Sequence, residues 1–240
     1  YVILGILILG FLLTACQKPA VTLTTPESVN GFKLNTFVQI DSYSGIPKKT
    51  LNEALNLCDY YENIFSRTKE DSELSRVNSN QTTDISKELY ELISAGLEYA
   101  ALSNGAFDIT IGSVSSLWDF TAESPKVPDS DKIAEALTHV DYTKINVTDN
   151  GDGTYSIIKP DDVILDLGAV AKGYIADKIK DLLEENGVKA AIINLGGNVL
   201  CIGKKTDTDN FGIGVRKPFA ANNEVLVALS VDNSSVVSSG

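Results

Sequence analysis

The sequence has little of what metal-binding or nucleic-acid-binding proteins usually carry. It contains a single histidine, His139, and no cysteine–histidine spacing of the kind found in zinc sites. No segment is rich in lysine or arginine, and the formal net charge is −12. A surface that binds a phosphate backbone needs a basic face. These absences argue against a His-based metal site and against a nucleic-acid partner.

The remaining composition is that of a globular protein. The 240 residues are 43% hydrophobic and 22% charged, which is an ordinary balance for a folded domain. This length is enough for one large domain or two small ones.

The N-terminal segment differs from this average. Residues 1–13 are almost wholly apolar, a run too short for a typical transmembrane helix but suited to the core of a secretory signal. Leu13-Thr14-Ala15-Cys16 follows and resembles a bacterial lipobox, in which the cysteine is acylated and becomes the mature N-terminus. A plain signal peptide and a buried strand remain as alternatives.

We therefore expect residues 1–15 to be a partial lipoprotein signal peptide and Cys16 to carry the lipid. The Thr- and Pro-containing residues 16–29 are expected to form a tether. Acylation with two or more chains would anchor the protein stably. The predicted location is the bacterial cell membrane, on its extracytoplasmic face.

Cys58 and Cys201 are the two other cysteines. An extracytoplasmic location permits a disulfide. However, Cys58 falls on the apolar face of a predicted helix and Cys201 inside an apolar run. The pattern favours two separately buried thiols.

Hydrophobic periodicity predicts an α+β fold, with hairpins and a strand–helix–strand unit. Asn150-Gly151-Asp152-Gly153 is a good hairpin signal. The predicted helices are residues 48–65, 86–102, 130–137 and 170–185, and the predicted strands are residues 32–40, 145–147, 155–158, 163–166, 190–195, 211–216, 224–231 and 235–238.

The most informative segment is residues 166–174. An apolar run leads into Asp166, and the small residues Gly168 and Ala169 precede Lys172 on a predicted helix. Ligands are often held just past the carboxyl end of a strand. A carboxylate and a lysine suit a magnesium–phosphate pair. Alternatively, Asp166 only caps the helix and Lys172 is solvated.

Five separate blocks, read together, resemble one family. Residues 66–78 carry S-x5-S-E-L-x-x-V-N, and residues 105–112 carry G-A-F-D-I-T-I-G, followed by L-W-D-F at residues 117–120. D-L-G-A-V-A-K-G stands at residues 166–173, N-L-G-G-N at residues 194–198 and V-S-S-G at residues 237–240. In this order they resemble the ApbE family of FAD:protein FMN transferases. The resemblance predicts an ApbE-like α+β domain, with mixed sheets and packed helices, over residues 30–240.

The resemblance also implies which residues bind the ligands. The backbone carbonyl of Ala169 matches a magnesium ligand. Leu34 stands where the family usually has Met, and Thr68 where some members have Tyr. The positions that match FAD contacts are Leu34, Thr68, Ala106, Phe107, Asp108, Asp166 and Lys172.

The family continues into a His-His-Ile block and an aspartate- and threonine-bearing loop, which supplies other magnesium ligands. Neither is present in this sequence. We therefore expect the C-terminal part of the domain to be missing, and this 240-residue chain to be inactive by itself.

The implied reaction is a magnesium-dependent transfer of FMN from FAD to a threonine hydroxyl of an acceptor flavoprotein, with release of AMP. The implied acceptors are flavin-carrying subunits of Na⁺-translocating NADH:quinone reductase or Rnf-type complexes. Two alternatives stay open. One is a magnesium-dependent FAD pyrophosphatase, and the other is a flavin-binding lipoprotein without catalysis.

Overall fold

The protein is described from a computed structural model that covers residues 22–119, 122–220 and 224–238. The α+β prediction is confirmed: the described residues form helices together with three antiparallel sheets, and the largest sheet combines strands from both ends of the chain. The expected signal peptide, Cys16 and the first part of the expected tether lie outside the described residues.

The largest sheet has five strands, all paired antiparallel with their neighbours. Val38 and Ile40 alternate with more exposed residues and are fully buried, so one face of the sheet belongs to the main core. In spatial order the strands are β1 (Thr22–Lys33), β2 (Thr36–Ser44), β6 (Ala191–Leu195), β7 (Asn198–Ile202) and β10 (Ser235–Val237).

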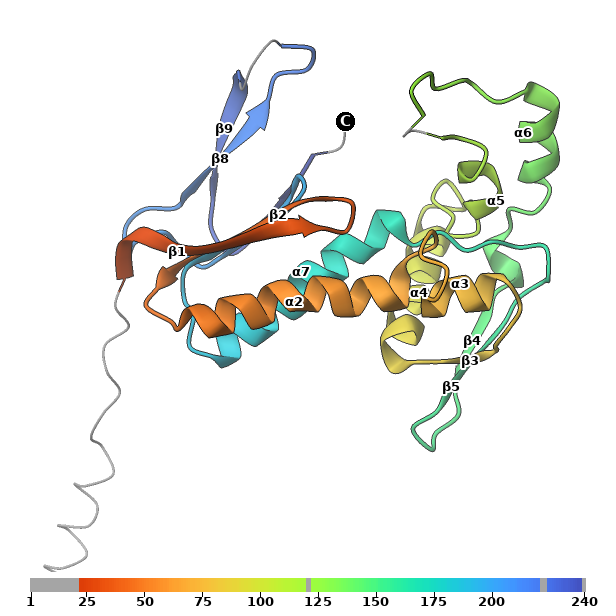
Figure 1. The fold of residues 1–240 in the computed structure, drawn as a ribbon, viewed down its shortest axis with the longest axis horizontal. Coiled ribbons are helices and arrows are strands. Elements are labelled where there is room, and N and C mark those ends of the chain that lie inside the picture. The colour runs from red at the N-terminus through yellow and green to blue at the C-terminus, as the bar shows by residue number, and fades with distance from the viewer. Residues whose placement is uncertain (1–21, 120–121, 221–223, 239–240) are drawn as a thin grey trace, which may run out of the picture.

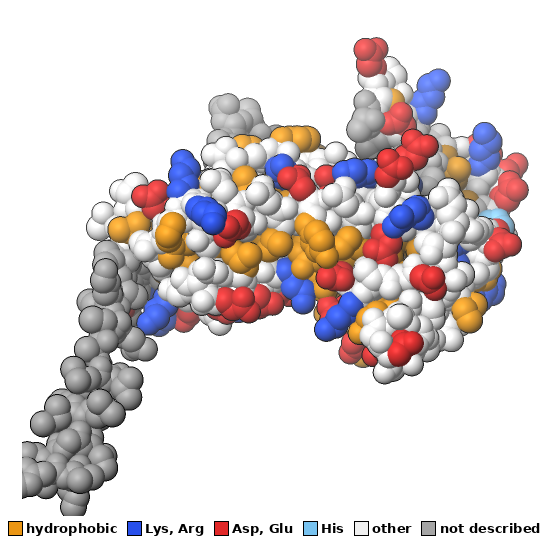
Figure 2. Space-filling view, turned by 60° about the horizontal axis from the view of Figure 1, so that its bottom comes forward, with side chains coloured by type: hydrophobic (Ala, Val, Ile, Leu, Met, Phe, Trp, Pro, Cys, Tyr) orange, Lys and Arg blue, Asp and Glu red, His pale blue; other side chains and the backbone are white. Residues whose placement is uncertain are grey.

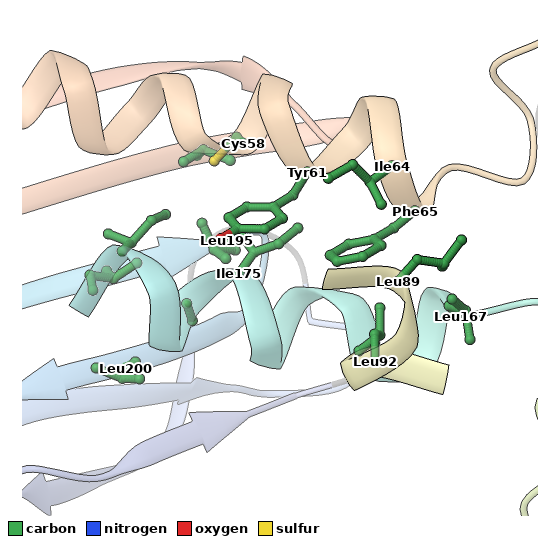
Figure 3. Packing of buried hydrophobic residues seen from close by; sticks show 14 of the residues in the cluster. Cys58, Tyr61, Ile64, Phe65, Leu89, Leu92, Leu167, Ile175, Leu195 and Leu200 are labelled. Atoms are coloured by element: carbon green, nitrogen blue, oxygen red, sulfur yellow. The ribbon is translucent and has the colours of Figure 1, made fainter. Parts of the chain in front are cut away.

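Two long helices, α2 (Lys48–Phe65) and α7 (Gly168–Glu185), lie against this buried face. Figure 1 shows them side by side beneath the β1–β2 hairpin. Buried residues of α2 recur at helical spacing, and Figure 3 shows Tyr61 and Phe65 pointing toward α7, with the Tyr61 ring beside Ile175. The predicted helical stripe of residues 48–65 therefore packs in the buried seam between α2 and α7.

A second hairpin, formed by β8 (Phe211–Arg216) and β9 (Val225–Val231), stands on the opposite side of the sheet (Figure 1). Phe211 and Val231 pack there with Cys201 in a small separate core. The remaining strands form the sheet β3–β5–β4. Its strands are β3 (Asp84–Ile85), β4 (Asn146–Asp149) and β5 (Tyr155–Ile158).

Serine residues are the N-caps of two further helices, α3 and α4. Ser72 accepts a hydrogen bond from the Ser75 amide at the start of α3 (Glu73–Asn78), and Ser86 accepts one from Leu89 at the start of α4 (Lys87–Leu102). Such caps satisfy amide donors that have no partner within the helix. Two short helices and a 3₁₀ turn complete the chain: α5 (Gly112–Ser115), α6 (Ser130–Leu137) and η1 (Tyr142–Lys144).

Three local predictions were wrong. Residues 22–29, expected as part of the tether, belong to β1 and pair with β2. Pro26 is tolerated because β1 is an edge strand, and the register shifts between Thr22 and Glu27. Residues 32–40, expected as one strand, contain the turn of the β1–β2 hairpin. Residues 163–166 form only one isolated bridge, between Ile164 and Ile111.

The prediction of two buried free thiols is confirmed. Burial raises the pKa of the Cys58 thiol to about 12 and that of Cys201 to about 11, so both stay protonated at neutral pH. Cys58 belongs to the main core, and Cys201 lies in the small core on the other side of the sheet.

On the face seen in Figure 2, acidic and basic side chains are interspersed rather than gathered in a basic patch. Among the helices of the described residues, we find none with the length and apolar character needed to cross a bilayer.

Candidate functional site

The segment that carries Asp166 is held on both sides by backbone hydrogen bonds. The Asp166 amide donates to the Ile109 carbonyl at 2.8 Å. On the other side, the Asn78 side chain pairs with both backbone groups of Leu165, at 2.9 and 2.8 Å. The two hydrogen bonds of the Asn78 side chain thus replace those that a neighbouring strand would make. The segment then leads into α7, which begins at Gly168.

The Asp166 carboxylate connects three parts of the chain. Its Oδ1 accepts from the Gly168 amide at 3.0 Å, where α7 begins. Its Oδ2 accepts from Arg67 Nε at 3.1 Å and from Ser115 Oγ at 2.8 Å. Leu167 is the N-cap residue of α7, so Asp166 is not the cap itself. One Asp166 oxygen accepts from the first amide of the helix, and the other accepts from Arg67 and Ser115.

A first pocket, of about 200 Å³, opens beside this carboxylate. Four of the predicted ligand positions line it: Leu34, Thr68, Asp166 and Lys172. Among the described residues, no carboxylate forms an ion pair with the Lys172 ammonium group.

Aromatic rings form one wall of the first pocket. Tyr61 and Phe65 stack with centroids 5.4 Å apart and an interplanar angle of 14°. Burial, aided by the charge of Glu88, raises the pKa of Tyr61 to about 12, so its phenol is neutral at physiological pH. The pocket therefore combines a flat apolar wall with charged groups, as nucleotide sites do.

Leu34 reaches this pocket from the two-residue turn between β1 and β2. Leu34 and Asn35 have φ values of 53° and 55°, as a type I′ turn requires. A leucine at positive φ is uncommon, and such conformations cluster at ligand sites. The turn itself accounts for the backbone conformation of Leu34.

A second pocket, of about 610 Å³, also has Asp166 in its lining. The other predicted positions line it: Ala106, Phe107, Asp108 and Ala169, together with Asp166. Asp166 and Gly168 line both pockets. All eight predicted residues therefore lie on two adjoining pockets that meet at Asp166.

Asp108 and Phe107 each have a structural role as well. Asp108 Oδ1 accepts from the amide and hydroxyl of Thr110 at 2.8 and 2.7 Å, and its Oδ2 accepts from the Tyr142 amide at 3.0 Å. Phe107 is half-buried against the main core. Both residues shape the loop at the pocket rim, and both still line the pocket.

Comparison with known proteins agrees with this geometry. The sequence model of the ApbE family matches residues 34–240. The chain belongs to the ApbE family. It is 30% identical over 226 residues to the FAD:protein FMN transferase of Treponema pallidum, covering 86% of this chain and 62% of that protein. A second FAD:protein FMN transferase, from Klebsiella pneumoniae, is 29% identical, with 79% of this chain and 58% of that protein covered.

The fold is that of a solved ApbE structure. The ApbE protein from Thermotoga maritima superposes with a TM-score of 0.77 at 29% identity, over 88% of this chain and 69% of that one. The chain thus spans about 60% of the length of the two curated relatives, by the coverages of 62% and 58%.

Asp166 and Ala169 both line the second pocket, to which Asp166 brings a carboxylate group. In the described part of the chain, no group of three His, Cys, Asp or Glu residues could hold a metal ion. Magnesium is usually bound by one or two carboxylates together with substrate phosphates and water. The donor set therefore fits a magnesium ion that arrives with a diphosphate, and it does not fit a cage made by these residues alone.

The glycines of the N-L-G-G-N block have a different role. Gly196 and Gly197, with φ values of 64° and 95°, form the tight turn between β6 and β7. They line a separate pocket of about 610 Å³, together with Thr36 and Ser238, and do not line the two pockets at Asp166. The turn interpretation accounts for both glycines.

Sequence reasoning missed three residues of the site. Arg67 and Ser115 bind the Asp166 carboxylate, and Asn78 holds the segment in front of it. Arg67 and Asn78 lie within the block of residues 66–78, so their proximity to Asp166 could have been suspected. Nothing in the pattern around Ser115 indicates its role.

Proposed function

We propose that the full-length protein transfers FMN from FAD to a threonine hydroxyl of an acceptor flavoprotein, with magnesium, and releases AMP. The observation that carries the proposal is the meeting of two pockets at Asp166, lined by all eight positions that the family pattern implies. Membership of the family and the names of the relatives support the same reaction class.

The chain's own residues would bind and orient the dinucleotide. Lys172 and Arg67 line the first pocket beside Asp166 and would attract the diphosphate. Phe107 offers a ring edge or face at the second pocket. Asp166 and the Ala169 carbonyl would hold magnesium, which supplies Lewis-acid stabilisation of the charge on the leaving phosphate when bound.

In the transfer, the acceptor's threonine oxygen forms a bond to the FMN-side phosphorus. The bond from that phosphorus to the bridging oxygen breaks, and AMP leaves with the bridging oxygen. The hydroxyl proton is released. The described residues are assigned to binding and orientation; none is assigned as the general base.

The test incubates the full-length protein with FAD, magnesium and a threonine-bearing acceptor domain. The expected result is an acceptor band with covalent flavin fluorescence and one AMP for each flavin transferred. FMN and AMP without labelling would support a pyrophosphatase instead. Tight FAD binding without turnover would support a non-catalytic flavin-binding protein. A threonine-to-alanine acceptor is the matched control.

The acceptor and the membrane are part of the same proposal. Flavin-carrying subunits of Na⁺-translocating NADH:quinone reductase or Rnf-type complexes would meet a lipid-anchored enzyme on one membrane face. The motif at Leu13-Thr14-Ala15-Cys16 supports the anchor.

Replacing Cys16 with serine should release the full-length protein from the membrane, because no acylated cysteine remains to insert its chains. The measurement is membrane fractionation of cells that express wild type or Cys16→Ser. Cys201→Ser serves as the control, since that buried thiol carries no lipid. A Cys16→Ser protein that stays in the membrane fraction contradicts the anchor.

A further inference from the structure

We propose that Arg67 positions Asp166 and also binds an anionic oxygen of the ligand's diphosphate, through the guanidinium N–H groups that Asp166 and Ser116 do not use. This inference rests on the proposed function only in placing a diphosphate-bearing nucleotide in that pocket.

Arg67 joins two segments that are distant in sequence. It follows the end of α2, and its Nε donates to Asp166 Oδ2 at 3.1 Å across 99 residues of chain. Its Nη1 donates to Ser116 Oγ at 2.8 Å, just after α5. The guanidinium group therefore fixes the carboxylate from one side, and Ser115 fixes it from another at 2.8 Å.

The backbone at Arg67 is held as firmly as its side chain. Ser75 Oγ lies 3.1 Å from the Arg67 carbonyl and 3.2 Å from the Ser66 carbonyl, and the Ser72 hydroxyl also donates to Ser66. The Ser66 hydroxyl accepts from the amides of Thr68 and Lys69, at 3.3 and 3.0 Å. A cation held in this way loses little conformational freedom when a ligand binds.

The guanidinium group of Arg67 has N–H donors that its protein partners do not use. A guanidinium group carries five N–H donors in a planar fork. Among the described residues, only Asp166 and Ser116 accept from it, through Nε and Nη1. The side chain is 25% exposed and lines the pocket together with Lys172. The remaining N–H groups suit a phosphate, which arginine binds with two parallel hydrogen bonds.

The two roles predict different ligand dependences. If Arg67 contacts a phosphate, its loss weakens ligands that carry a diphosphate and spares the matching nucleoside. If Arg67 only stabilises the fold around Asp166, its loss weakens both ligands equally. ADP and adenosine are the matched probes, because they differ only in the diphosphate.

The experiment measures the affinity of the full-length protein for each probe by titration calorimetry. EDTA is present so that no metal ion bridges the protein and the diphosphate. Arg67→Gln should weaken ADP roughly 10- to 100-fold, the equivalent of a charge-assisted hydrogen bond, and adenosine by less than about threefold. Arg67→Lys keeps the charge but lacks the fork, so ADP should weaken by an intermediate factor. Lys69→Gln removes an equal charge from an exposed neighbour and should leave both affinities near wild type.

Equal weakening of ADP and adenosine by Arg67→Gln overturns the phosphate contact, as does unchanged ADP binding. If Arg67→Gln does not fold, Arg67→Lys decides alone: ADP affinity equal to that of wild type overturns the proposal. These measurements need no acceptor. A wild type that binds ADP through Arg67 but labels no acceptor would defeat the proposed function and leave this inference standing.

Discussion

Replacing Asp166 with alanine in the full-length protein is expected to lower the rate of FMN transfer by about 10²- to 10³-fold. Preorganised electrostatic groups at the reacting phosphate typically have effects of this size. Among the described residues, Asp166 is the one carboxylate that lines both the first and the second pocket, and it would carry the magnesium. Its loss also leaves Arg67 without its anionic partner.

The isosteric change Asp166→Asn separates chemistry from folding. Asparagine keeps an oxygen that accepts from the Gly168 amide where α7 begins, but it removes the charge that Arg67 and magnesium would bind. We expect nearly the same loss of transfer as for alanine. The loss of stability should be smaller than the roughly 1–3 kcal/mol expected when alanine leaves donors unpaired.

The measurement is the initial rate of covalent flavin labelling, with the free energy of unfolding determined in urea for each variant. Ser116→Ala is the control: it removes a hydroxyl near Arg67 without touching Asp166 itself. Labelling by Asp166→Ala at the wild-type rate would contradict the assignment of this carboxylate.

Much of the helical structure could be predicted from the sequence, because its apolar residues recur with helical spacing. Leu51, Leu55 and Cys58 on α2 are all buried, as the stripe implied. The hairpin at Asn150-Gly151-Asp152-Gly153 was predicted equally well, because Gly151 and Gly153 supply the positive φ values of its turn, 80° and 88°.

The wrong predictions involve structure that depends on distant partners. Leu34-Asn35 turns the chain without a glycine, so residues 32–40 read as one strand. Residues 22–29 have the Thr and Pro of a tether, yet they pair with β2. Residues 163–166 hydrogen-bond to the backbone near Ile109 and to the Asn78 side chain. Both partners are distant in sequence, so no local pattern predicts them.

The candidate site was predictable in outline, since all eight of its expected ligand positions line the first or the second pocket. Local chemistry at Asp166 and Lys172 suggested a phosphate pocket, and the family pattern supplied the other six positions. What the sequence did not show was how they come together. The ion pair between Arg67 and Asp166 depends on α2 ending next to the start of α7, and that contact is set by the buried seam between the two helices (Figure 3).

The tight contact beside Asp166 leads to the second large expected effect: Gly112→Ala should destabilise the protein by about 1–3 kcal/mol, the usual penalty for overpacking a core. Gly112 donates its amide to the Ile164 carbonyl at 3.0 Å. A methyl group on Gly112 would lie 2.4 Å from that carbonyl oxygen and 2.6 Å from Ile164 Cγ2. Since one of these atoms is backbone, relief requires the segment itself to move.

Gly173→Ala is the matched control, in the helix that follows. A methyl group there meets nothing within 4 Å, and Gly173 lies inside α7. We expect a gain of about 0.5–1 kcal/mol from the better helix former. The two glycine variants should therefore move the urea midpoint in opposite directions. A Gly112→Ala protein as stable as wild type would contradict the close contact between Gly112 of α5 and the Ile164 backbone. Because Ile164 stands two residues before Asp166, the displacement should also lower FMN transfer by Gly112→Ala at temperatures where the variant is still folded.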